Sequence, residues 1–302
     1  MNKHFILLLI CLLSNLSFAQ NEGVLDRLQA IRNNDMIFCN VDGYQITSET
    51  FNRAFTEKGL KKVYRKYSVD KDAPKIKDEQ LPYNNLYITT DEIRAEGIVQ
   101  NNAFYFIELD KNQLSVVQFI ALNKRDKAFE QVMVSLLMED GIPEENFAAT
   151  TIDTINFAGR NIQLGSNCYW TAINTVQCPY LGEMNWSVHK DLQDAQNSAA
   201  QQYAITASRK NGDIVSEEQV ALIFEGTETT AKKIIYDFKG VTSLLVGMSG
   251  GKTLTVFYVA APVRGNYVSC VLSFLEQRQH YRYGPRTALR RGDAIEGITL
   301  GS

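Results

Sequence analysis

CYWTAINTVQCPYLGEMNWSVHKDL, residues 168–192, contains both tryptophans of the chain, two of its five cysteines and one of its three histidines. Its second half alternates in character: Met184, Trp186 and Val188 are apolar, and the residues between them are polar. This period of two predicts a strand with one apolar and one polar face, the polar one ending at His189.

The first half of this stretch, from Cys168 to Cys178, allows two arrangements. As one continuous strand it has a mostly apolar face, and its cysteines lie about 33 Å apart, too far to bond. If the chain instead turns near Ile173-Asn174, the two cysteines face each other and a disulfide closes the loop. No glycine or proline marks a turn here and the run is rich in β-forming residues, so we predict the continuous strand.

The N-terminus points to an exported protein, in which the cysteines can form disulfides. Residues 1–19 have a basic start, an apolar run and a small-residue exit at Ala19, which is typical of a cleaved signal peptide. We therefore expect an exported, soluble protein, periplasmic or extracellular, with no membrane span. Four cysteines remain after the leader and permit two disulfides in three pairings: Cys39, Cys168, Cys178 and Cys270.

Strand-like and helix-like segments follow one another in both halves of the chain. They predict an α+β fold of antiparallel β-meanders packed against a few helices, in two units of similar size. We place an N-terminal domain at residues 20–145, a C-terminal domain at 146–278 and a basic tail at 279–302. An overlay of residues 114–116 on 254–256 leaves two explanations open, related units or a chance likeness between two hairpins.

Helical periodicity or start signals occur in several segments. The predicted helices cover residues 23–32, 48–66 with Ser48 as the N-cap, 124–138, 191–208 and 229–236.

Two motifs that resemble catalytic signatures are rejected on context. Gly247 to Gly251 matches the G-x-S-x-G pattern of a serine hydrolase, and Gly251-Lys252-Thr253 resembles the end of a phosphate-binding loop. Both signatures require a helix directly afterwards, whereas residues 253–260 are rich in β-formers. We interpret the segment as a glycine-rich turn.

The sequence also gives no support for metal, cofactor or nucleic-acid binding. Cys168, Cys178 and His189 are separated by nine and ten residues, unlike the short pairs of zinc sites, so we expect no metal and no cofactor. The net charge is −3, and the basic segment 58–77 is diluted by acids, so we expect no nucleic-acid partner.

The function we predict is binding without catalysis, to an unknown ligand or an envelope protein. Its candidate residues are the aromatic side chains of the opening stretch and the histidine beside them, namely Tyr169, Trp170, Tyr180, Trp186 and His189. The alternative is a secreted hydrolase with a dispersed acid/base site near His189, using Glu183 or Asp191. A pocket holding His189 with a carboxylate in hydrogen-bond reach would favour the enzyme, and a flat aromatic patch would favour binding.

Overall fold

The computed structural model describes residues 23–70, 72–150, 152–164, 168–178, 182–240, 243, 251–277 and 298–300. The expected leader, Tyr180, most of the basic tail and positions 247–250 of the glycine-rich motif lie outside these ranges.

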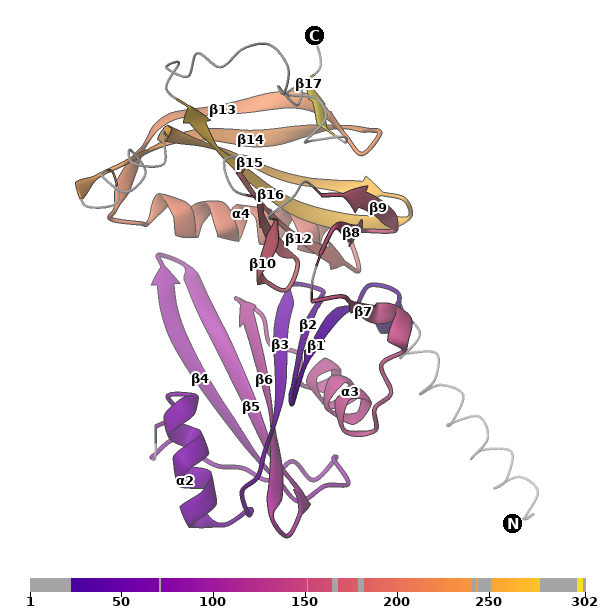
Figure 1. Ribbon diagram of the computed structural model, residues 1–302. Helices are drawn as coiled ribbons and strands as arrows, with labels where there is room; N and C mark the ends of the chain where they lie inside the picture. Colours follow the sequence, from indigo (N-terminus) through magenta and orange to yellow (C-terminus); the bar gives the residue numbers. More distant parts are fainter. Residues whose placement is uncertain are drawn as a thin grey trace, which may run out of the picture.

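The first sheet has seven strands in the order β4-β5-β6-β3-β2-β1-β7 (Figure 1). All neighbours pair antiparallel except β1 and β7. The strands are β1 (Gln29–Asn33), β2 (Met36–Val41), β3 (Tyr44–Phe51), β4 (Asn85–Ala95), β5 (Ile98–Asp110), β6 (Gln113–Leu122) and β7 (Phe147–Ala148).

The second sheet has eight strands in the order β10-β11-β12-β16-β15-β14-β13-β17, all antiparallel. They are β10 (Tyr169–Ala172), β11 (Thr175–Cys178), β12 (Gly182–His189), β13 (Gly212–Phe224), β14 (Thr227–Phe238), β15 (Gly251–Val263), β16 (Asn266–Gln277) and β17 (Ile298–Leu300). A separate hairpin is formed by β8 (Thr154–Phe157) and β9 (Arg160–Gln163).

Each sheet is covered on both faces. The longer helices are α2 (Glu57–Lys66), α3 (Lys127–Met138) and α4 (Leu192–Ala207), and a short 3-10 turn, η1, spans Glu144–Asn146. On the first sheet, α3 and α2 pack against opposite faces. On the second sheet, α4 packs on the face that carries Val256 and Tyr258, and the β8–β9 hairpin packs on the other face.

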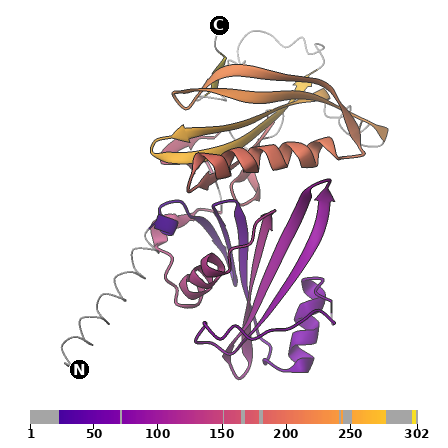
Figure 2. The same ribbon diagram turned by 180° about the vertical axis from the view of Figure 1, so that it is seen from behind.

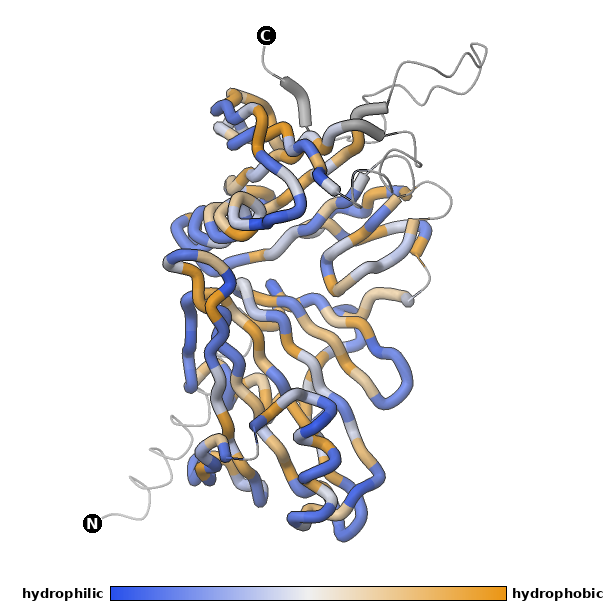
Figure 3. The backbone as a smooth tube through the Cα atoms, turned by 90° about the vertical axis from the view of Figure 1, so that its left-hand side faces the viewer, coloured by the Kyte–Doolittle hydropathy of each residue, from blue (hydrophilic) through white to orange (hydrophobic). Residues whose placement is uncertain are grey.

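The two sheets lie one above the other, with α4 along the side of the second sheet that faces the first (Figures 1 and 2). Apolar stretches run through the strands and polar ones gather in the turns (Figure 3). The fold class is therefore as predicted: α+β, with antiparallel meanders packed against helices. Within the described residues, no helix is long and apolar enough to cross a membrane.

Two helix predictions need correction in the first unit, which is the part of the chain that forms the first sheet. Helix 23–32 is correct only at residues 23–25, because Gln29–Asn33 forms β1, in which Ala30 and Ile31 are buried between β2 and β7. Ser48 is not an N-cap, since β3 continues to Phe51. The helix begins at Glu57 instead, and the side chain of Thr56 accepts a hydrogen bond from the Gly59 N–H.

The helix predicted at 229–236 is also wrong. This segment is the centre of β14, paired on both sides with β13 and β15, and Ile234 is fully buried. Its β-branched residues, among them Thr229, Thr230 and Ile235, suit a strand better than a helix. Helix 191–208 was predicted correctly within one residue at each end, and Asp191 caps it by accepting from the Asp194 N–H.

The continuous strand predicted from Cys168 to Cys178 is wrong as well. The chain turns at Ile173-Asn174 into the β10–β11 hairpin, and the two cysteines form a disulfide. The turn needs no glycine because Asn174 takes a φ of +53°, a conformation that asparagine tolerates better than most residues. Cys39 and Cys270, the other two disulfide candidates, are buried free thiols.

Candidate functional site

A pocket of about 590 Å³ lies between the two sheets. Its walls come from the β2–β3 turn and the end of β6 in the first unit, and from β12, β15, β16 and α4 in the second. The volume falls within the range of small-molecule binding sites. This pocket is the candidate site.

The polar face of β12 forms one wall. Glu183, Asn185, Ser187 and His189 line the pocket. The intervening Met184, Trp186 and Val188 pack into the core on the other side of the sheet. The period of two in the sequence therefore predicted this wall correctly.

Helix α4 forms a second wall, which the sequence interpretation missed. Its lining residues recur at steps of three and one, which is one continuous helical face: Asp194, Asn197, Ser198, Gln201, Gln202, Ile205, Thr206 and, just past the helix, Arg209. The sheet side of the helix buries only the small residues Ala195 and Ala199. The side-chain amides at positions 197, 201 and 202 recur at helical spacing, and this pattern could have predicted the polar wall.

The floor between these walls is apolar. Leu254, Val256 and Tyr258 of β15 and Val271 of β16 line it. Val256 and Tyr258 also belong to the cluster that holds α4 on the sheet. The pocket is thus amphipathic, with an apolar base and polar sides.

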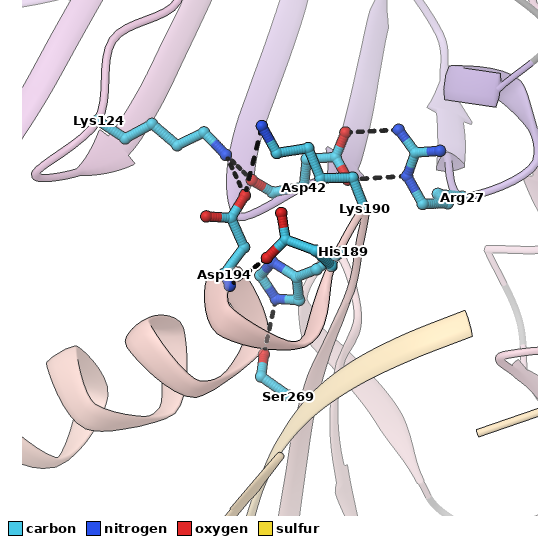
Figure 4. Close-up of polar contacts among 8 residues, drawn as sticks. Arg27, Asp42, Lys124, His189, Lys190, Asp194 and Ser269 are labelled. Atoms are coloured by element: carbon cyan, nitrogen blue, oxygen red, sulfur yellow. Dashed lines mark hydrogen bonds and ion pairs between the residues drawn. The ribbon is translucent and has the colours of Figure 1, made fainter. Parts of the chain in front are cut away.

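Ionic contacts fix the end of the pocket where the two units meet (Figure 4). Arg27 donates two hydrogen bonds of 2.8 Å to the buried carboxylate of Asp42, in the β2–β3 turn. Lys124 donates to the Asp42 carbonyl oxygen at 3.0 Å and pairs with Asp194 of α4 at 3.2 Å. One lysine therefore ties the first unit to the first turn of α4.

His189 lies at the same end and is 2% exposed. Its Nε2 is 2.9 Å from the Ser269 Oγ, and that hydroxyl donates in turn to the Ser198 Oγ of α4. Because the Ser269 proton is used, His189 donates from Nε2, which leaves Nδ1 as an acceptor. Burial lowers the pKa of His189 to about 4, so the ring is neutral near pH 7.

The Nδ1 atom of His189 has no hydrogen-bond partner among the described residues. Gly43, with a φ of +76°, packs against this edge of the ring, and a Cβ there would lie 3.4 Å from the His189 Cε1. Both residues line the pocket. An unsatisfied acceptor therefore stands in the pocket wall.

The predicted aromatic residues that the structure describes do not form one surface. Tyr169 is 49% exposed, whereas Trp186 is 1% exposed and lies in the core of the second unit. Trp170 is partly buried, with its ring centre 6.0 Å from that of Trp186 and its Nε1 donating to the Ala149 carbonyl oxygen. Of the five predicted binding residues, the described structure places only His189 in the pocket.

The hydrolase alternative requires a carboxylate bonded to His189. The Asp191 carboxylate instead accepts from the Asp194 N–H as the helix cap. Glu183 lines the pocket six residues before the histidine on the same strand. In the described part of the chain, no carboxylate hydrogen-bonds to His189, and no group of three or more metal-ligating side chains occurs.

Comparison with known proteins adds only weak likenesses. No family model and no curated protein matches the chain. A crystal structure from Bacteroides thetaiotaomicron VPI-5482 is similar over 71% of this chain and 81% of that one, at 9% identity and a TM-score of 0.27. The di-domain ARO/CYC protein StfQ of the steffimycin biosynthetic pathway is similar over 83% and 74%, at 10% identity and a TM-score of 0.16.

A third similar structure is DynU16, a protein of the dynemicin biosynthetic locus, which covers 82% of this chain and 74% of its own at 8% identity and a TM-score of 0.19. At such TM-scores, these likenesses carry no argument about what the chain binds.

Proposed function

We propose that this is an exported, non-catalytic binding protein whose ligand occupies the pocket between the two sheets. The observation that carries the proposal is the pocket itself, which combines about 590 Å³ of space, walls from both units and an unpartnered buried acceptor at His189. Export rests on the leader at residues 1–19 and on the Cys168–Cys178 disulfide, which suits an oxidising compartment.

A ligand in the pocket is better supported than an envelope protein on an aromatic surface. Trp186 is fully buried and Trp170 partly so, which leaves Tyr169 as the exposed aromatic among the described candidates. A protein interface needs a larger contiguous patch than a single ring supplies.

Binding is also better supported than hydrolysis. His189 is neutral and bonded to Ser269, and no described carboxylate bonds to it. A general base needs a partner that orients it and stabilises its charged form. The pocket offers positioned hydrogen-bonding groups without that arrangement.

Filling the pocket tests the proposal. Ser273 lines it from β16, and Ser273→Trp would occupy its volume. Val215 is 58% exposed on the same sheet, so Val215→Trp is the matched control. In a fragment screen by ligand-detected NMR, we expect hits on the wild-type protein and on Val215→Trp that disappear with Ser273→Trp. An unchanged set of hits would place binding elsewhere.

A further inference from the structure

We propose that the ligand is a peptide segment bound in extended form along the slot between β12 and α4. This inference rests on the proposed function and deepens it by naming the ligand class. The slot's shape, its hydrogen-bonding groups and its charges each support a peptide.

The shape follows from the connection between the two walls. Only Lys190 and Asp191 separate the end of β12 from the start of α4, and the helix then crosses the sheet, so that Ser198 reaches Ser269 of β16 and Tyr203 reaches Glu217 of β13. The lining face from Asp194 to Arg209 is about 22 Å long at 1.5 Å per residue. The polar face from Glu183 to His189 is about 20 Å long. The slot is therefore narrow at His189 and widens towards Glu183 over the floor of β15 and β16, and its β12 wall matches about six residues of an extended chain.

The hydrogen-bonding groups are mainly side-chain amides and hydroxyls. Gln201 and Gln202 face the slot from α4, and Asn185 faces it from β12. Each of these amides both donates and accepts, as each residue of a peptide backbone does. No described hydrogen bond occupies the side chain of Gln201 or Gln202, so both are available to a ligand.

The Nδ1 atom of His189 needs a hydrogen-bond donor. It is a buried acceptor at one end of the slot, and a buried acceptor without a donor costs about 1–3 kcal/mol. Gly43 covers this edge of the ring, so a backbone N–H of a bound peptide would supply the missing donor once the β2–β3 turn moves aside.

The charges and the apolar floor favour a peptide over a neutral sugar chain. Glu183 and Arg209 line the slot, and neither forms an ion pair with a described residue. Both lie at the end of the slot away from His189, where they can meet charged side chains of a bound peptide. Leu254 and Val271, which are partly exposed, offer contacts to apolar side chains. Sugars, in contrast, stack on exposed aromatic faces, and the ring of Tyr258 on the described lining is 4% exposed.

The test uses two probe sets against the full mature chain: a degenerate mixture of end-capped hexapeptides and a mixture of neutral hexasaccharides. Capture is read by affinity selection and mass spectrometry. We expect the hexapeptides to be enriched and dipeptides of the same composition to be retained at least tenfold less, because the slot spans about six residues. Enrichment of hexasaccharides in place of peptides would overturn the peptide inference.

Matched variants place the peptide in the slot. Gln201→Leu removes an amide that lines it, whereas Gln196→Leu makes the same change on an exposed position of α4 outside it. We expect peptide capture to fall at least fivefold in Gln201→Leu and to stay unchanged in Gln196→Leu, with both melting temperatures close to wild type. Equal capture by the two variants would refute the peptide slot.

The outcomes also separate this inference from the proposed function. If sugars or fragments bind in a manner that Ser273→Trp abolishes while peptides do not bind, the pocket is a ligand site and the peptide class is wrong. If Ser273→Trp changes the binding of no probe, both proposals fail.

Discussion

The backbone N–H of Asp42 donates a 2.9 Å hydrogen bond to the carbonyl oxygen of Val188. This bond joins the β2–β3 turn of the first unit to β12 of the second. It is possible because β11 pairs with β12 only between Gly182 and Asn185, which leaves the edge of β12 free at Val188. The Ser187 Oγ donates to the Asn40 Oδ1 beside it at 2.9 Å, so the pocket wall is continuous from one unit to the other.

The ion pair behind this contact should be important for stability. Arg27→Gln would leave the Asp42 carboxylate, which is 6% exposed, without its bidentate partner. Removing one member of a buried pair is strongly destabilising, and we expect a loss of about 3 kcal/mol in the free energy of unfolding, measured by urea denaturation.

Arg32→Gln is the control for that prediction. Arg32 pairs with Asp140 and Glu144 at the surface, where both acids are largely exposed. Such a pair contributes about 0–1 kcal/mol. Equal losses for Arg27→Gln and Arg32→Gln would show that the buried geometry does not hold in solution.

The Cys168–Cys178 disulfide should stabilise the β10–β11 hairpin. It closes a loop with a sequence separation of 10 residues, for which chain entropy predicts about 2–3 kcal/mol. We expect the double variant Cys168→Ala/Cys178→Ala to lose this amount in denaturant unfolding. Reductant should destabilise the wild-type protein and leave the double variant unaffected. A wild-type protein that is insensitive to reductant would contradict the pairing.

Substitution of the two tryptophans should lower the free energy of unfolding by clearly different amounts. Trp186 packs against Phe157 and is almost fully buried, so we expect Trp186→Ala to cost about 3–5 kcal/mol in the free energy of unfolding. Trp170 is partly exposed, and Trp170→Ala should cost less. If the two losses are equal or reversed, Trp170 is the core residue and its place in the hairpin is wrong.

Local sequence patterns predicted the pieces of the site more successfully than their assembly. The alternation from Met184 to His189 predicted the polar wall, because a strand's period is independent of its partners. The β2–β3 turn is formed by Asp42 and Gly43, which both take positive φ. Nothing in these patterns indicated that the turn would meet β12, since Asn40 and Ser187 lie 147 residues apart.

The errors have a common physical origin. Residues 229–236 and 29–33 contain helix-compatible spacing, but each segment is enclosed by two neighbouring strands, and that pairing outweighs a local periodicity. At Asn174, a positive φ in a residue other than glycine concealed the turn that brings the cysteines together. In each case, contacts with residues distant in the sequence determined the local structure.

His189 should make stability depend on pH in acid. Burial lowers its pKa to about 4, compared with the usual 6.5 expected for the unfolded chain. Between these values the unfolded state binds a proton that the folded state does not, so stability falls as the pH drops from 6.5 towards 4. A shift of this size corresponds to about 3 kcal/mol.

His189→Gln isolates that contribution. Glutamine retains a donor for Ser269 and does not titrate, whereas the carboxylates titrate in both proteins and cancel in the comparison. We expect the difference in unfolding free energy between wild type and variant, measured by urea denaturation at steps of pH, to be constant above pH 6.5 and to change by about 3 kcal/mol in favour of the variant on acidification. If the two curves stay parallel down to pH 4, the imidazole is not buried in the way that the pocket requires, because a solvated ring would keep its ordinary pKa.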